Sequence, residues 1–190
     1  MDKQKGLLEV IEKRRAYRGI SDKPLQADVI QRLLTAATYA PSCFNKQPWR
    51  FLAAVKEEAL DKVRGALAGG NYWAQKAPFY VVAVTRPDLD CQLNDGRDYA
   101  LFDVGQAVMS LQHQAVHEGL IAHPIAGFSP DKLKASFGIP DDYIVITVVI
   151  IAHPGNDEGL NEKHKALEHS ERTRAPQNET VAFDNWNFAT

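Results

Sequence analysis

Residues 40–51, APSCFNKQPWRF, connect an expected helix to an expected strand and carry many hydrogen-bonding side chains. Pro41 ends the helical pattern before them, and residues 49–55 form an apolar run of strand length. Between the two lie polar side chains on a backbone that prolines restrict: Ser42, Asn45, Lys46 and Gln47, with Pro41 and Pro48. The pattern alone fits either an ordinary helix-to-strand connection or a loop that presents these groups to a ligand.

Helical and strand patterns alternate on both sides of this connection. Amphipathic spacing predicts helices over residues 2–13, 24–40, 56–68, 98–119 and 129–136. Apolar runs rich in β-branched residues predict strands over residues 49–55, 78–85, 120–125 and 143–152. The fold class that we expect is therefore α+β, with several helices around a central sheet in a single domain, residues 1–190.

The composition limits the kinds of partner. The 190 residues are 45% hydrophobic and 24% charged, with a formal charge of -2, so the chain can bury one core but lacks the basic field that nucleic acid or an anionic membrane would require. No stretch approaches the ~20 apolar residues of a membrane span, and the first residues do not resemble a signal peptide. Only two cysteines occur, Cys43 and Cys91, too few for a disulfide framework. We expect a soluble cytoplasmic protein with reduced cysteines.

From about residue 156 the composition becomes polar, yet the chain ends in an arm that carries large apolar side chains. They are Val181, Phe183, Trp186 and Phe188. Such groups need a surface to bury against, which a second subunit would supply.

A basic cluster, Arg14-Arg15-Ala16-Tyr17-Arg18, follows the first expected helix. Guanidinium groups match phosphate oxygens in a two-pronged geometry, so these arginines could clamp a phosphate. The alternative is a solvated helix end whose cations complement the helix dipole. A second basic pair, Arg172 and Arg174, lies in the polar tail and, taken alone, is typical of a charged surface.

Other polar clusters carry weaker signals. His113 and His117 have a spacing that can hold a metal, but no third ligand is evident, so no metal site is expected. An acidic loop lacks the spacing and the glycine of an EF-hand, and a solvated loop is the better interpretation of Asp88, Asp90, Asp95 and Asp98. No GxSxG, Walker or GxGxxG motif stands out.

The order RRAYR, a helix, then APSCFNKQPW before a strand resembles the FMN-dependent nitroreductase family, whose N-terminal part reads RRSxR and then PSSxNxQPW. The resemblance continues with Ala77-Pro78 before a buried strand, the long central helix, HPIAGF at 123–128 and the basic pair in the tail. It implies a nitroreductase-like α+β fold whose central, mostly antiparallel sheet is surrounded by helices. It also implies a homodimer that exchanges the C-terminal arm and shares two FMN sites.

The resemblance also implies which residues bind the cofactor. Arg14 and the tail arginines would surround the phosphate, and Arg18 would approach the pyrimidine edge of the flavin, where a cation favours the reduced anion. The 41–47 loop would hold the flavin of the other subunit. The full set is Arg14, Arg15, Ala16, Arg18, Pro41, Ser42, Cys43, Asn45, Gln47, Asn71, Pro124, Ile125, Ala126, Gly127, Arg172 and Arg174.

Two positions depart from the family pattern. Ala16 stands where the family usually has a serine, so one flavin contact is expected to be missing. Cys43 also replaces a common serine, and it is either a redox-active thiol or a small packing residue. His123 either lines the substrate face or is a hydrogen-bonded structural histidine.

The function that the resemblance implies is electron transfer from NADH or NADPH, through FMN, to a nitroaromatic, quinone or flavin in a ping-pong cycle. No side chain need act as acid or base in such a cycle, and we name no catalytic residue. Three alternatives remain open. The first is a specialised family branch, such as a flavin reductase that serves a partner monooxygenase or an enzyme that uses bound reduced flavin on an unusual substrate. The others are a non-catalytic FMN carrier or sensor and a scaffold that keeps only the fold. The sequence distinguishes neither NADH from NADPH nor one acceptor from another.

Overall fold

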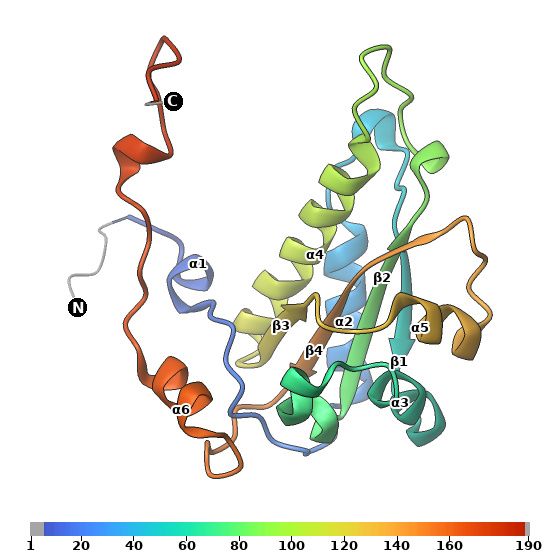
Figure 1. Cartoon of the computed structure of the whole chain (residues 1–190), viewed down its shortest axis with the longest axis vertical. Helices are drawn as coiled ribbons and strands as arrows, with labels where there is room; N and C mark the ends of the chain where they lie inside the picture. Colours follow the sequence, from blue (N-terminus) through green and yellow to red (C-terminus); the bar gives the residue numbers. More distant parts are fainter. Residues whose placement is uncertain (1–5, 189–190) are drawn as a thin grey trace.

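The computed structural model describes residues 6–188, which form a layered α+β fold around one sheet (Figure 1). The strands are β1 (Arg50–Ala54), β2 (Phe79–Thr85), β3 (Ile121–Ile125) and β4 (Ile144–Ala152). The helices are α1 (Glu9–Lys13), α2 (Ala27–Thr38), α3 (Glu57–Arg64), α4 (Tyr99–His117), α5 (Pro130–Phe137) and α6 (Glu162–His169). Short 3-10 turns occur at Cys43–Asn45, Gly69–Lys76, Pro87–Leu89 and Gln177–Glu179.

The sheet has four strands in the order β1-β2-β4-β3, and every neighbouring pair is antiparallel. The expected fold class is therefore confirmed, including the antiparallel sheet. Strand β2 lies between two others and all its side chains are buried, because its run of apolar and β-branched residues satisfies both faces of a covered sheet.

Side chains that alternate along β2 divide the core into two parts. Phe79, Val81 and Ala83 pack with residues of α2 and α4, including Leu33 and Leu111. The intervening side chains of β2 pack on the opposite face, with α3, α5 and the 69–76 turn. The sheet therefore separates a layer made of α2 and α4 from a layer made of α3 and α5.

The sequence signals at helix ends agree with the structure. Ser129 caps α5, because its Oγ accepts from the amide of Lys132, and Gly138 ends that helix in the left-handed region at φ 66°. Helix α6 was not predicted, since the polar tail shows no apolar periodicity and none of its residues is buried. The expected helix over 2–13 begins at Glu9 in the described part of the chain, and residues 2–5 lie outside it.

Residues 19–21 and residues 153–155, far apart in the sequence, are joined by backbone hydrogen bonds. The amide of Ser21 donates to the carbonyl of His153 (2.9 Å), and the amide of Gly155 donates to the carbonyl of Gly19 (2.8 Å). A Cβ at Gly155 would lie 2.4 Å from the backbone of Ile20, so only glycine allows this approach. Figure 1 shows α1 and the C-terminal segment side by side, away from the sheet.

The C-terminal arm leaves large apolar side chains in water. Phe183 is 74% exposed and Trp186 is 83% exposed. The arm in this single chain thus lacks the surface that its aromatic groups would need for burial.

No helix within residues 6–188 has both the length and the apolar character that a membrane crossing requires.

Candidate functional site

The C-terminal tail is fastened to the end of α1 by an arginine. The Nη2 atom of Arg172 donates to the carbonyls of Glu12 (2.7 Å) and Arg14 (2.6 Å), and its Nη1 atom donates to the carbonyl of Ile11 (3.3 Å). The last carbonyls of a helix lack partners within the helix, so a guanidinium group is well suited to them. The basic cluster of residues 14–18 and the basic pair of the tail therefore come together, as the resemblance implies.

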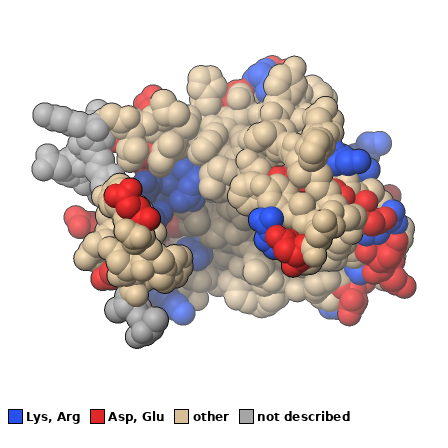
Figure 2. Space-filling model, turned by 90° about the horizontal axis from the view of Figure 1, so that it is seen from above, with Lys and Arg blue, Asp and Glu red and all other residues tan. Residues whose placement is uncertain are grey.

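Positive charge accumulates where these segments meet. The pKa of Arg14 lies below its usual value, first because the group is partly buried and then because Arg172, Arg174 and Arg15 repel its charge. Within residues 6–188, none of these four arginines lies within ion-pair distance of an acidic side chain. Figure 2 shows Lys and Arg side chains gathered in the hollow beside the C-terminal arm. Such a cluster favours binding of an anion.

Glu168 of α6 shapes the backbone of the basic cluster. Its carboxylate accepts hydrogen bonds from the amides of Arg18 (2.9 and 3.1 Å) and Gly19 (2.9 Å). The sequence analysis missed this residue, because a glutamate in a polar tail has no local feature that marks it as a partner of residues 150 positions away. Helix α6 thus holds the segment that carries the arginines.

A stack of side chains continues from the basic cluster towards β3. The guanidinium of Arg18 lies 5.9 Å from the ring centre of Trp73, and that ring lies 4.7 Å from the imidazole of His123. The Nε1 atom of Trp73 is buried and has no hydrogen-bond partner among the described residues. A buried indole N–H without a partner is unusual in a folded protein and is a free donor beside Arg18.

His123 is buried and in hydrogen-bonding contact with the backbone. Its Nδ1 atom lies 3.0 Å from the carbonyl of Tyr17, and burial lowers the pKa of the imidazole to about 4. The ring is therefore neutral at pH 7, and Nδ1 carries the proton because a carbonyl oxygen only accepts. With 6% of its surface exposed, His123 does not line an open substrate face in this chain.

Asn71 and the segment that follows β3 lie against each other. The Nδ2 atom of Asn71 donates to the carbonyl of Gly127 (2.7 Å), which also accepts from the amide of Ala68 (2.9 Å). A Cβ at Gly127 would lie 2.6 Å from that Nδ2 atom, so a larger residue would displace the Asn71 side chain from this position. Of the other residues in the segment, Ile125 is buried, Pro124 is half-buried and Ala126 is exposed.

The 41–47 loop is strained and partly bonded to itself. The Oγ atom of Ser42 accepts from the amide of Gln47 (2.9 Å), and the side chain of Gln47 donates to that of Asn45 (3.1 Å). Phe44, Asn45 and Gln47 all have left-handed backbones, with φ between 46° and 56°, and Phe44 is 90% exposed. Strain in a loop that points an aromatic ring into water is typical of a binding segment.

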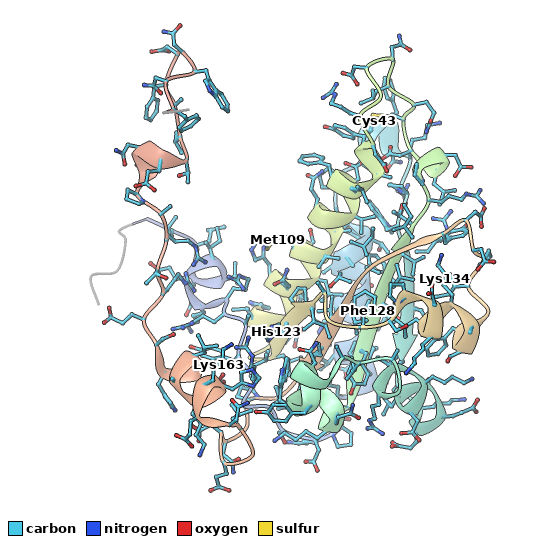
Figure 3. The ribbon with its side chains drawn as sticks, viewed as in Figure 1. Cys43, Met109, His123, Phe128, Lys134 and Lys163 are labelled. Carbon is cyan, nitrogen blue, oxygen red and sulfur yellow. A yellow bond between two sulfur atoms is a disulfide. The ribbon has the colours of Figure 1, made fainter. Side chains whose placement is uncertain are left out.

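One chain does not bring this loop to the basic cluster. The amide of Cys43 donates to Asp103 near the start of α4 (2.7 Å), whereas His123 lies in the strand that follows the end of α4. Figure 3 accordingly shows Cys43 near the upper end of α4 and His123 well away from it, beside the lower part of that helix. The predicted site residues therefore form two groups in the single chain. Arg14, Arg15, Ala16, Arg18, Asn71, Pro124, Ile125, Ala126, Gly127, Arg172 and Arg174 belong to one; Pro41, Ser42, Cys43, Asn45 and Gln47 belong to the other.

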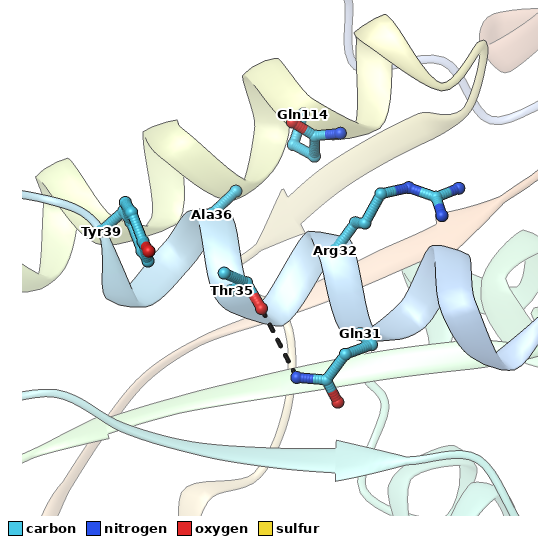
Figure 4. Close-up of a pocket in the computed structure, with 6 residues that line it drawn as sticks. All are labelled: Gln31, Arg32, Thr35, Ala36, Tyr39 and Gln114. Carbon is cyan, nitrogen blue, oxygen red and sulfur yellow. Dashed lines mark hydrogen bonds between the residues drawn. The ribbon is translucent and has the colours of Figure 1, made fainter.

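A surface groove of about 460 Å³ lies between α2 and α4 (Figure 4). Its lining residues are Gln31, Arg32, Thr35, Ala36, Tyr39 and Gln114. The charge of Arg32 is already matched by Glu118 (2.6 Å) and Asp28 (2.9 Å). The groove thus contains neither predicted site group and lacks the unpaired charge of the basic cluster.

Comparison with known proteins connects this arrangement to a family. Residues 11–81 match the model of the nitroreductase family, a range that includes RRAYR and the 41–47 loop. An NADH dehydrogenase of Thermus thermophilus is 24% identical over 186 residues, covering 82% of this chain and 90% of that protein. A crystal structure described as an oxidoreductase containing FMN superimposes with a TM-score of 0.88 at 25% identity, over 98% of this chain and 96% of that one. The chain belongs to the nitroreductase family.

A second family structure extends the same result. A nitroreductase family protein of Clostridium novyi NT has a TM-score of 0.71 at 25% identity, covering 80% of this chain and 87% of that one. The nitroreductase-family assignment makes this chain an oxidoreductase. It also confirms the resemblance that the sequence motifs suggested.

The nitroreductase-family chain departs from expectation at its cysteines. The prediction of reduced cysteines is wrong: Cys43 is joined to Cys91 by a disulfide, with Cα atoms 6.2 Å apart. Cys43 is therefore neither a free thiol nor a simple packing residue in this structure. The interpretation failed because the pairing depends on two loops, 41–47 and 86–98, that are separated in sequence and meet beside the start of α4.

The acidic 86–98 loop is also not wholly solvated. Asp90 is 4% exposed, against the expectation, because it lies under the disulfide next to Asp103, which is itself 1% exposed. Burial raises the pKa of Asp90, and repulsion from Asp103 acts in the same direction. Asp88 and Asp95 are exposed, as a solvated loop predicts.

Proposed function

We propose that this chain is an FMN-dependent oxidoreductase that passes electrons from NADH or NADPH to a nitroaromatic, quinone or flavin acceptor. One observation supports this proposal above all: the arginines at residues 14, 15, 172 and 174 crowd together without an acidic partner among residues 6–188. A dianionic phosphate group would relieve their repulsion, and FMN carries one.

Residues near the basic cluster of residues 14–18 would contact the flavin ring of FMN. Bound FMN would supply the redox chemistry, accepting a hydride from the nicotinamide and returning two electrons to the second substrate in alternation. Arg18 would place its cation at the pyrimidine edge, held there by Glu168 through the backbone and by Trp73 through its ring face. The unpartnered Nε1–H of Trp73 is an additional donor on this side.

The second group of predicted residues would come from the other subunit of a homodimer. The 41–47 loop cannot reach the basic cluster of its own chain, and its strained backbone already presents Phe44 outwards. Exposed apolar side chains also occur at the end of α2, on α4 and on the C-terminal arm: Tyr39, Leu101, Phe102, Met109, Phe183 and Trp186. Burial of these groups between two chains would provide the association free energy.

The visible spectrum of the purified protein tests this proposal. We expect a flavin band that NADH or NADPH bleaches without oxygen and that a nitroaromatic or quinone restores. A flavin band that neither nicotinamide bleaches would make the protein a carrier, and no flavin binding after FMN is supplied would refute the assignment. Light scattering of the same sample measures the mass, and a monomer with bound FMN would refute the shared site.

A further inference from the structure

A cluster of potential metal ligands lies where the 41–47 and 86–98 loops meet. One ligand atom each from Cys43, Asp90 and Cys91 lies within 4.8 Å of the other two. Figure 3 shows Cys43 at the end of the molecule that carries the 86–98 loop. These residues belong to different loops, so a ligand that they shared would join the loops.

One carboxylate oxygen of Asp90 has no hydrogen-bond partner among the described residues. Its Oδ1 atom accepts from the amide of Cys91 (2.7 Å), but its Oδ2 atom is buried and has no hydrogen bond among the described residues. The residue is 96% buried, since only 4% of its surface is exposed. The charged neighbours that act on it are Asp103 and Asp98, both acidic. A buried carboxylate oxygen without a cation or a donor is costly, and a cation bound at Oδ2 would reduce that cost.

Asp103 supports the cluster from behind. Its Oδ2 atom accepts from the amide of Cys43 (2.7 Å), and its Oδ1 atom accepts from the side chain of Gln106 (3.1 Å). The Oδ2 atom thus ties Cys43 to α4, and the Oδ1 atom is held by a side chain of the same helix. Asp103 therefore orients a neighbouring residue and leaves Asp90 as the carboxylate with an oxygen to offer.

We propose that reduction of the Cys43–Cys91 disulfide creates a Zn²⁺ site whose ligands are the two sulfur atoms and Oδ2 of Asp90. A dithiol reductant would supply two electrons and two protons, breaking the S–S bond to give two thiols while it forms its own disulfide. Zn²⁺ would then replace the thiol protons, which pass to the solvent. The disulfide and the metal are mutually exclusive, because both use the same sulfur atoms.

The spacing of the two cysteines suits either state. Tetrahedral zinc with Zn–S bonds of about 2.3 Å places its sulfur atoms about 3.8 Å apart. Side chains whose Cα atoms are 6.2 Å apart can reach this separation by rotation about their own bonds. Two thiolates and one carboxylate favour Zn²⁺ over Mg²⁺ or Ca²⁺, which prefer oxygen ligands. Three protein ligands leave the fourth position for water.

Zinc content after controlled reduction tests the site, and the test is independent of FMN. The full-length, untagged protein is either reduced or left oxidised, incubated with zinc chloride, desalted and measured for bound zinc. We expect about one zinc ion per reduced chain and a negligible amount in the oxidised chain. Equal zinc content in the two samples would overturn the proposal.

Matched variants identify the ligands. In the reduced protein, Cys91→Ser should abolish binding, and Asp90→Asn should weaken it at least about tenfold. Asp88→Asn is the control, because Asp88 lies in the same loop but is exposed and bound to Arg86 (2.5 Å). Unchanged affinity in Asp90→Asn would overturn the three-ligand site.

Cobalt provides a second measurement that needs no variant. Co²⁺ occupies zinc sites and gives a sulfur-to-metal absorption band only when thiolates bind it. We expect this band in the reduced wild-type protein and its loss when zinc is added in excess. Cobalt bound without the band would show that the metal lies elsewhere and would refute the proposal.

Discussion

The two ends of the molecule show opposite imbalances of charge. At the basic end, Arg14, Arg15, Arg172 and Arg174 have no acidic side chain within ion-pair distance among residues 6–188, and at the thiol end, Asp90 and Asp103 are buried with no cationic side chain within that distance in the same range. The basic end comprises residues 14–18 with Arg172 and Arg174, and it faces solvent beside the C-terminal arm. The thiol end comprises the 41–47 and 86–98 loops, which the Cys43–Cys91 disulfide joins. The comparison indicates that uncompensated charge of either sign marks a position where a ligand of opposite charge would stabilise the structure.

Removal of charge at the basic end should have the largest effect. If the arginines hold the phosphate as proposed, FMN would lose two charged partners worth about 1.5–3 kcal/mol each in the double variant Arg14→Ala and Arg172→Ala. We therefore expect the dissociation constant for FMN to rise at least about 100-fold in a fluorescence titration. Arg97→Ala is the control, because this exposed arginine pairs only with Asp95 among the described residues. Flavin binding that survives the double variant would show that the arginines do not hold the phosphate.

Opening of the disulfide should have the next largest effect, and it acts at the thiol end. The bond joins residues 48 positions apart, so it restricts the unfolded chain and stabilises the fold by about 4 kcal/mol in the chain-entropy estimate. We expect the urea midpoint to fall on reduction in the presence of a chelator, which keeps metal from replacing the bond. The double variant Cys43→Ser and Cys91→Ser should unfold at the same urea midpoint with and without the reductant. An unchanged midpoint for the reduced wild-type protein would contradict the expectation.

The same comparison shows what the sequence could reveal. The arginines of residues 14–18 are adjacent in the chain, so their joint role was visible as a motif, and the buried strands were visible as apolar runs. The disulfide could not be predicted from the sequence, because Cys43 and Cys91 meet only after two loops fold against α4. Helix α6 and the role of Glu168 were not predicted for a related reason: the helix buries no residue, so its sequence shows no apolar face.

A third prediction concerns pH at the basic end. The pKa of His123 is lowered from 6.5 to about 4 in the folded protein, so between these values the unfolded chain binds more protons. Stability from this residue is thus present above about pH 6.5 and is lost as the pH falls towards 4, by up to ~3 kcal/mol. In His123→Gln, urea unfolding should show a smaller loss over this window.

The control for this prediction is His117→Gln, which removes an exposed histidine at the end of α4. The substitution is at the surface and leaves the contacts of His123 in place, so this variant should follow the wild-type profile. The difference between the two variants isolates His123 from the carboxylates that titrate in the same range. Identical profiles for both variants would mean that His123 is not held neutral by the fold.

The smallest effect is expected for Glu168→Gln. This variant distinguishes the role of Glu168 in holding the backbone of residues 18 and 19 from the effect of its negative charge on the basic end. Glutamine has one acceptor oxygen, whereas the carboxylate accepts from two amides with both of its oxygens, so the fold should lose about 1–2 kcal/mol. Glu171→Gln, an exposed acid in the same segment, is the control for the lost charge. If Glu168 acts by shaping residues 18 and 19, FMN binds more weakly to Glu168→Gln than to the control. If its negative charge merely opposes the phosphate, FMN binds more tightly, and the backbone contacts that place the arginines would not govern cofactor affinity.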